Sequence, residues 1–194
     1  MKTNNFQSTA GLLRAATLVL LLVATACQEK KTESADTAAA GVEVPAIDIH
    51  TAVVSGNLEV VQQHIAAGSD INVRDPFGGS SPLISAAVFG KTEIAQVLLD
   101  AGASIDFQNN DGSTALHSAA FFGRPEIVKL LLAKGADKSI KNKYNATAYE
   151  NVAAPFADMK PAYDMMVSVL GPMGLTLDYA YLEKVRPEIA ALLK

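Results

Sequence analysis

The residues from Ser85 to Thr92 end in Gly90-Lys91-Thr92, which is how a phosphate-binding loop ends. Such a loop also needs a glycine at its first position, so that backbone N–H groups can surround a phosphate, and a strand before it. Ser85 stands at that first position, and Gly123-Arg124-Pro125 recurs 33 residues after Gly90 in the same relative place. We therefore interpret the segment as a structural turn, and we expect no nucleotide or other cofactor.

The histidines and carboxylates also offer little catalytic chemistry. His50, His64 and His117 do not show the short spacings, such as i and i+4 on a helix, that metal ligands share, so no metal site is predicted. Ser118 follows His117 without the Gly-x-Ser-x-Gly elbow of a hydrolase. A small hydrolase that uses carboxylates of residues 143–194 stays open as an alternative, because paired carboxylates can act as acid and base. No catalytic residue is predicted.

Cys27 is the only cysteine, and it follows an apolar run, residues 15–23. The run is shorter than the roughly 20 residues that span a bilayer, and Lys2 and Arg14 provide positive charge before it, as in a signal peptide. Residues 23–27 resemble the lipobox of bacterial lipoproteins, although Ala24 stands where leucine is commonest. The resemblance implies a lipoprotein signal peptide over 1–26 and a lipid on Cys27. An ordinary signal peptide with an incidental cysteine is the alternative.

The segment after the cysteine is polar and has almost nothing to bury. Residues 27–46 are therefore predicted to be a lipid-anchored flexible tether. Gln28 implies, by the same resemblance, the outer membrane, and we expect the protein to face the periplasm, with the cell surface or secretion as alternatives. Lys2 and Arg14 are the only charged residues before Cys27, so the chain from Cys27 has a formal charge of −6. That charge argues against nucleic acid or anionic lipid as a partner.

The chain from Asp48 to Asn142 repeats itself. Gly90 recurs as Gly123 and Gly102 as Gly135, each after 33 residues, and the step from Gly56 to Gly90 is 34. A constant period of this length is typical of a solenoid, in which each unit buries its apolar face against the next.

The repeated segments resemble ankyrin repeats. Residues 81–87 (SPLISAA) and 114–120 (TALHSAA) resemble the signature Thr-Pro-Leu-His-x-Ala-Ala, and residues 93–103 and 126–137 resemble its second half. Residues 48–75 are a looser earlier copy. The resemblance implies an all-α ankyrin-repeat solenoid over 47–142, with helix-turn-helix repeats and short β-hairpin loops. In that family the signature histidine, here His50 and His117, is a structural hydrogen bonder.

Local signals agree with this fold. Ser81 and Thr114 are typical helix caps, Pro82 suits a first turn, and Pro125 with Glu126 can start a second helix. Glycines are expected to end the helices. Hairpin loops are expected over 107–112 and 141–145. Helical spacing predicts that the second helices bury Ile94, Val97, Leu98, Ile127, Leu130 and Leu131.

Residues 143–194 are predicted to be a degenerate repeat with a C-terminal cap. Pro155 is expected to end a short helix that begins near Thr147, and a second helix is expected over 162–170. A short helix over 178–184 is expected before Arg186-Pro187-Glu188-Ile189, which repeats Arg124-Pro125-Glu126-Ile127.

The resemblance also indicates a binding surface. In ankyrin domains the concave face is formed by the positions held here by Ser85, Val88 and Phe89 and by Ser118, Phe121 and Phe122. Thr51, Val54 and Ser55 are their equivalents in the first copy. Aromatic side chains among small polar groups suit a protein interface, although packing between repeats is an equal alternative for the phenylalanines. Further candidates in the loops are Phe77, Asn109 and Tyr144.

The sequence therefore favours a non-catalytic ankyrin-repeat lipoprotein that binds a protein partner in the bacterial envelope, with no small-molecule substrate. An inhibitor or immunity protein against a secreted toxin or enzyme is a more specific version of the same hypothesis.

Overall fold

The computed structural model describes residues 43–194. The predicted signal peptide, Cys27 and most of the predicted tether lie outside the described residues. The described chain forms nine α-helices and one 3-10 helix. Their bounds are α1 Ile49–Ser55, α2 Leu58–Ala66, α3 Pro82–Phe89, α4 Thr92–Asp100, α5 Ala115–Phe121, α6 Pro125–Ala133, α7 Ala148–Ala153, α8 Phe156–Leu170, η1 Gly171–Met173 and α9 Tyr179–Leu193.

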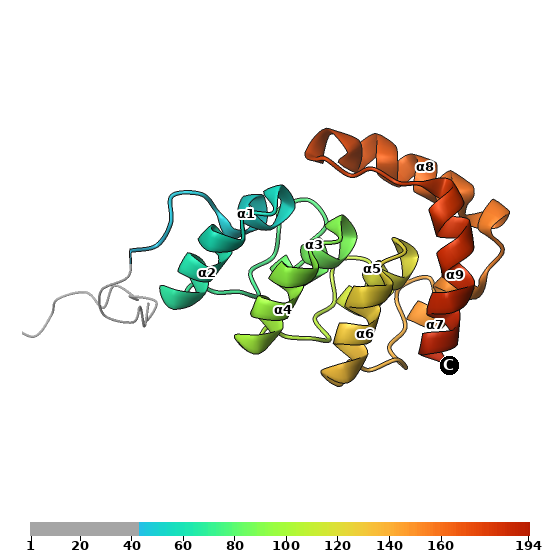
Figure 1. Ribbon diagram of the computed structural model, residues 1–194, viewed down its shortest axis with the longest axis horizontal. Helices are drawn as coiled ribbons and strands as arrows, with labels where there is room; N and C mark the ends of the chain where they lie inside the picture. The colour runs from blue at the N-terminus through green and yellow to red at the C-terminus, as the bar shows by residue number, and fades with distance from the viewer. Residues whose placement is uncertain (1–42) are drawn as a thin grey trace, which may run out of the picture. The chain divides into compact units, whose positions relative to one another are not determined.

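The helices stack in two rows, which we call the inner row (α1, α3, α5 and α7) and the outer row (α2, α4, α6 and α9). Each inner helix contacts the next inner helix, and each outer helix contacts the next outer helix. Within a repeat the inner helix also packs on its outer partner, and α7 packs on α9 in the same way. Figure 1 shows the two rows side by side from α1 to α6. The stack thus contains three complete repeats and a fourth formed by α7 and α9.

Each inner helix begins at an equivalent cap. The side chains of Asp48, Ser81, Thr114 and Thr147 each accept a hydrogen bond from the backbone N–H three residues on. Such a bond satisfies one of the four N–H groups that a helix leaves unpaired at its start. The caps predicted at Ser81 and Thr114 are confirmed, and Pro82 is at the first turn of α3 as expected.

Small and large apolar side chains together fill the space between the repeats. Ala52, Ala86 and Ala119 are fully buried at equivalent inner-row positions, and they let neighbouring helices approach closely. Of the six residues predicted to be buried in the second helices, Ile94, Leu98, Ile127 and Leu131 are confirmed. Val97 and Leu130 are only half-buried.

His117 has the structural role that the family resemblance implies. Its Nδ1 lies 2.9 Å from Thr114 Oγ1, and its Nε2 lies 3.1 Å from the carbonyl oxygen of Ala146 in the next loop. His50 Nε2 lies 3.1 Å from the carbonyl oxygen of Val73, just before the first loop between repeats. These side chains therefore tie an inner helix to the loop that follows its repeat.

The loops between repeats differ from the expectation of short β-hairpins. They lie where they were predicted, but residues 43–194 contain no strand. Each loop instead closes through a cross-loop backbone hydrogen bond, from Asp75 N to Ser80 O, from Asn109 N to Ser113 O, or from Asn142 N to Ala146 O.

The C-terminal helices are longer than predicted. Helix α8 starts at Phe156 rather than Ala162, and α9 is one continuous helix rather than a short helix followed by a new start at Pro187. Pro161 lies inside α8 and Pro187 inside α9. Each proline removes one N–H from the helix, but both lie on exposed faces where water can bond the carbonyls left free.

Candidate partner-binding surface

The three loops between repeats are built around equivalent side chains. Asp75 accepts hydrogen bonds from the N–H groups of Phe77, Gly78 and Ser80, each at 2.7 Å. Burial would raise the pKa of Asp75, but these three N–H groups outweigh it and hold the pKa below its usual value. Asn109 and Asn142 accept two backbone N–H bonds each in their own loops. The amide oxygen of Asn109, a predicted binding residue, is thus engaged within its loop.

The residues two positions further on form what we call the loop-tip row: Phe77, Asp111 and Tyr144. The side chain of Phe77 is 84% exposed and that of Tyr144 is 75% exposed, the two most exposed large apolar side chains among the described residues. Neighbouring tips are joined by backbone hydrogen bonds, from Asn110 N to Gly78 O at 2.9 Å and from Lys143 N to Asp111 O at 2.8 Å. Two aromatic rings are therefore presented to solvent on a connected backbone.

The inner-row positions predicted to form a concave binding face are less accessible. Ser85 and Ser118 are buried, and Val88 and Phe89 are half-buried. For Phe122 the packing alternative holds rather than the binding role, because it is only 6% exposed and its ring packs edge-on against Phe121.

Phe121 is half-buried because α8 covers it. The ring of Tyr163 in α8 lies 4.4 Å from the ring of Phe121, centroid to centroid, and Tyr163 Oη donates a 2.7 Å hydrogen bond to the Phe121 carbonyl. Tyr163 is itself fully buried. The C-terminal helices therefore occupy the third repeat's part of the predicted surface.

Arg186 in α9 holds this arrangement together. Its guanidinium is buried and donates to Tyr163 Oη at 2.7 Å and to the carbonyl oxygens of Asn151 and Ala154, where α7 ends. Those carbonyls carry the negative end of the α7 dipole, which favours a cation. Sequence reasoning noticed the repeat at Arg186 but missed this role, because the partners lie 23 to 35 residues away.

The Gly90-Lys91-Thr92 segment is a structural turn, as interpreted. Lys91 precedes α4, and its Nζ lies 3.1 Å from the position that a Cβ on Gly56 would take. Arg124 approaches Gly90 in the same way one repeat later. The basic side chain of each turn therefore crosses the glycine of the preceding repeat.

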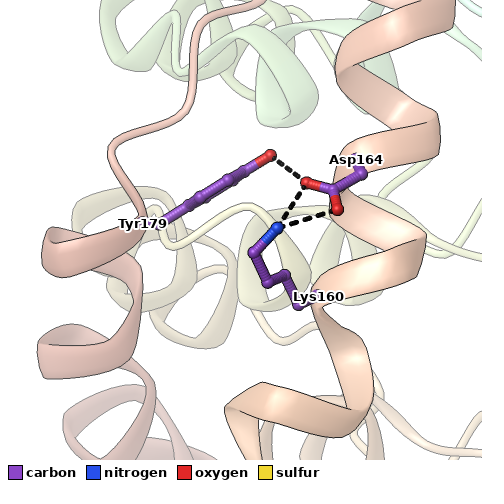
Figure 2. A network of polar contacts seen from close by, with 3 residues as sticks. All are labelled: Lys160, Asp164 and Tyr179. Atoms are coloured by element: carbon purple, nitrogen blue, oxygen red, sulfur yellow. Dashed lines mark hydrogen bonds and ion pairs between the residues drawn. The ribbon is translucent and has the colours of Figure 1, made fainter.

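A polar network joins α8 to α9 on the protein surface, as Figure 2 shows. Lys160 Nζ donates to both carboxylate oxygens of Asp164, at 2.9 and 3.1 Å, and Tyr179 Oη donates to Asp164 Oδ1 at 2.7 Å. The hydrogen bond from Lys160 lowers the pKa of Asp164, and the bond to Asp164 raises the pKa values of Lys160 and Tyr179.

Each of these three pKa values moves away from neutrality, whereas a general acid or base works best near the operating pH. The network is therefore better suited to holding α8 against α9 than to acid–base catalysis of hydrolysis. Across residues 43–194 no group of three or more His, Cys, Asp or Glu side chains is placed to hold a metal ion.

The repeats match a known family. Residues 49–142 match the family described as ankyrin repeats, in three copies. This segment is an ankyrin repeat domain. The crystal structure of the ankyrin repeat domain of Bcl-3, a unique member of the IkappaB protein family, is similar to it with a TM-score of 0.51 and 39% sequence identity. That similarity covers 53% of this chain and 45% of the Bcl-3 chain.

Two curated relatives carry the same kind of repeat. Protein phosphatase 1 regulatory subunit 27 of Homo sapiens is 44% identical over 64 residues, which cover 33% of this chain and 41% of the relative, and its Mus musculus counterpart has the same identity and coverage. The chain thus spans about two fifths of the length of these relatives. Proteins of these kinds are generally non-catalytic, and the comparisons support a protein–protein interaction module. None of the helices within residues 43–194 is both long and apolar enough to cross a membrane.

Proposed function

We propose that this ankyrin repeat domain captures a protein partner in the bacterial envelope, and that the loop-tip row is the centre of the binding surface. The observation that carries the proposal is the exposure of Phe77 and Tyr144, at 84% and 75%, at equivalent positions of hydrogen-bonded loops. Aromatic side chains bury a large area and lose few rotamers, which makes them frequent anchors of protein interfaces.

Asp111 is exposed, and its loop lies between the loops that carry Phe77 and Tyr144. Its position favours a partner that offers two apolar pockets with a hydrogen-bond donor or a basic side chain between them. The curated relatives are named as regulatory subunits, which agrees with capture of another protein rather than catalysis. Their similarity to this chain spans only 64 residues, so it gives no reason to propose the phosphatase as the partner.

The proposal places the domain on a membrane through a lipid on Cys27, the residue that the lipobox resemblance identifies. Attachment of two or more acyl chains would make this anchoring stable. Cys27→Ala should abolish metabolic labelling with a fatty acid and leave the protein soluble or unprocessed. If the variant still fractionates with membranes, anchoring has another cause.

The binding surface is tested by recovering the envelope partner with the purified domain and measuring its affinity for two variants. Phe77→Ser and Tyr144→Ser should each weaken binding about tenfold or more, since truncating a central aromatic anchor often costs about 2 kcal/mol. Their melting temperatures should not change, because both rings are exposed. Lys129→Ala, an exposed change on α6 of the outer row, is the matched control. Unchanged affinity in both loop variants would exclude the loop-tip row.

A further inference from the structure

Helix α8 has two halves of different character. Its first half, residues 156–164, is fixed to the stack by Tyr163 and braced to α9 by Asp164 and Tyr179. The rings of Phe156, Tyr163 and Tyr179 pack on one another there. No residue of the second half, Met165–Leu170, is buried. Figure 1 shows α8 running from the α9 end of the stack back along the side of the inner row, with its second half furthest from α9.

The free end of α8 is apolar and uncharged. We call residues 165–174 the apolar tip. No charged residue occurs from Met165 to Leu177, and Met165, Val169 and Met173 are 55%, 61% and 41% exposed. Another long stretch without charged residues includes α3, but most of that helix is buried in the stack and offers no comparable exposed surface. Exposed apolar patches of this kind mark a surface that another phase or molecule covers.

The backbone hydrogen bonds of the tip are also compatible with a medium that contains no water. Gly171 N–H bonds the Val167 carbonyl, Gly174 N–H bonds the Gly171 carbonyl at 2.8 Å, and Leu175 N–H bonds the Leu170 carbonyl at 3.1 Å. The helix end therefore closes on itself and leaves fewer unpaired polar groups at the tip. Unpaired backbone groups are the main cost of placing a chain in hydrocarbon.

We propose that the apolar tip inserts into the surface of a lipid bilayer and so orients the tethered domain. This inference rests on the proposed membrane attachment for its setting. Interfacial helices lie in the membrane plane with their apolar face buried about 5–10 Å deep, and the helical part of the tip, about 9 Å long at 1.5 Å per residue, is a short apolar segment that can lie in this way. The 15 residues between Cys27 and Glu43, the first described residue, make 16 Cα–Cα steps, which can span at most about 55 Å. That reach exceeds the ~30 Å expected for four helices stacked at 8–10 Å spacing.

The charge of the chain defines the kind of lipid. Asp164 and Asp178 flank the uncharged stretch, and the chain from Cys27 has a formal charge of −6. Anionic headgroups would repel such a protein, so the tip should bind a zwitterionic surface through apolar burial alone. This behaviour differs from that of basic amphipathic helices, which need anionic lipid.

The test uses unlipidated residues 37–194, which include all of the described helices and contain no cysteine. An environment-sensitive fluorophore is attached to Val169→Cys, and in a matched control to Phe77→Cys. Vesicles of phosphatidylethanolamine and phosphatidylcholine at millimolar lipid should shift the emission of the Val169→Cys label to the blue, and lipids with a nitroxide on the acyl chain should quench it. The label on Phe77→Cys, a more exposed position, should show neither effect.

Substitutions should then lower vesicle affinity without affecting folding. Met165→Ser and Met173→Ser should each weaken vesicle binding about fivefold, the change expected for withdrawing half of a large apolar side chain from lipid. Phe77→Ser should change it less than twofold. The melting temperature of each variant should match that of the parent, because these side chains are exposed.

Three results would overturn the inference. The Val169→Cys label could stay in water at saturating lipid, or binding could require anionic lipid and disappear with salt. The emission of the label could also stay unchanged with vesicles and shift only when the captured partner is added, which would make the tip a protein-docking surface. Because this protein carries no lipid, a failure of Cys27 lipidation would not alter the result, and the two proposals can fail separately.

Discussion

At the scale of single residues, Tyr163 shows how much depends on one hydroxyl. It donates a partly buried hydrogen bond to the Phe121 carbonyl and accepts a buried one from Arg186. Burial raises its pKa, so the hydroxyl keeps its proton as a donor. Tyr163→Phe should lower the free energy of unfolding by about 1–3 kcal/mol, because a carbonyl and a guanidinium lose their partner. Urea unfolding measures this loss.

Tyr181→Phe is the control for that substitution, because the Tyr181 side chain is 42% exposed. A change within about 0.5 kcal/mol is expected there. Equal effects of the two substitutions would show that the hydrogen bonds of the Tyr163 hydroxyl add nothing to stability beyond the packing of its ring.

His117 should make stability depend on pH. Burial lowers its pKa below the ordinary value of 6.5, against hydrogen bonds to Ala146 and Ile140 that raise it. The unfolded chain therefore binds the proton more readily, and stability falls as pH drops below about 6.5 toward the folded pKa. Urea unfolding between pH 7.5 and 5 should show this loss, at most about 1.4 kcal/mol per pH unit for one proton.

His117→Gln should flatten the slope in that range. Carboxylates with lowered pKa values, such as Asp48 and Asp75, lose their contribution only at lower pH, so they do not interfere. An unchanged slope in the variant would assign the pH dependence to other groups.

At the scale of elements, the helices of the three complete repeats were predictable because each has its own local signals. Ser81 with Pro82 and Thr114 with His117 define helix starts within four residues of sequence. The burial of Phe122 and the covering of Phe121 were not predictable in this way. They depend on α8 and α9, whose key pair, Tyr163 and Arg186, is set by packing rather than by local pattern.

At Gly123 both the backbone conformation and the lack of space for a side chain require a glycine. Its φ is +66°, and a Cβ there would lie 2.5 Å from Leu182 Cδ2, in a side chain that is fully buried and has no room to move. Gly135 has a φ of +88° with nothing within 4 Å of its Cβ position. Both alanine variants should suffer about 1–2 kcal/mol of backbone strain. Gly123→Ala should lose about 1–3 kcal/mol more from overpacking.

Thermal or urea unfolding of the two variants separates the two causes. Equal losses would show that Leu182 and its neighbours on α9 do not pack tightly on the third repeat.

At the scale of the whole molecule, the C-terminal region is best described as a fourth repeat with an expanded turn. In the third repeat Phe122-Gly123-Arg124-Pro125 joins the inner to the outer helix. In the fourth, Arg186-Pro187 starts the equivalent outer segment, and the Arg186 guanidinium bonds the Ala154 carbonyl at the end of α7. Residues 155–185, which include α8, therefore lie between the two halves of one repeat.

This description predicts that the stack survives without the insertion. Replacing residues 155–185 with a single glycine should leave one cooperative unfolding transition, since Arg186, which bonds the carbonyls at the end of α7, and the rest of α9 after it are kept. The free energy of unfolding should fall by more than about 5 kcal/mol, because Tyr163, Leu175, Leu182 and Val185 are all buried in this segment and one large buried ring alone usually costs about 3–5 kcal/mol. Hydrophobic dye binding should rise as Phe121 and Phe122 become exposed. A variant that unfolds without a cooperative transition would show instead that residues 155–185 are an integral layer of the stack.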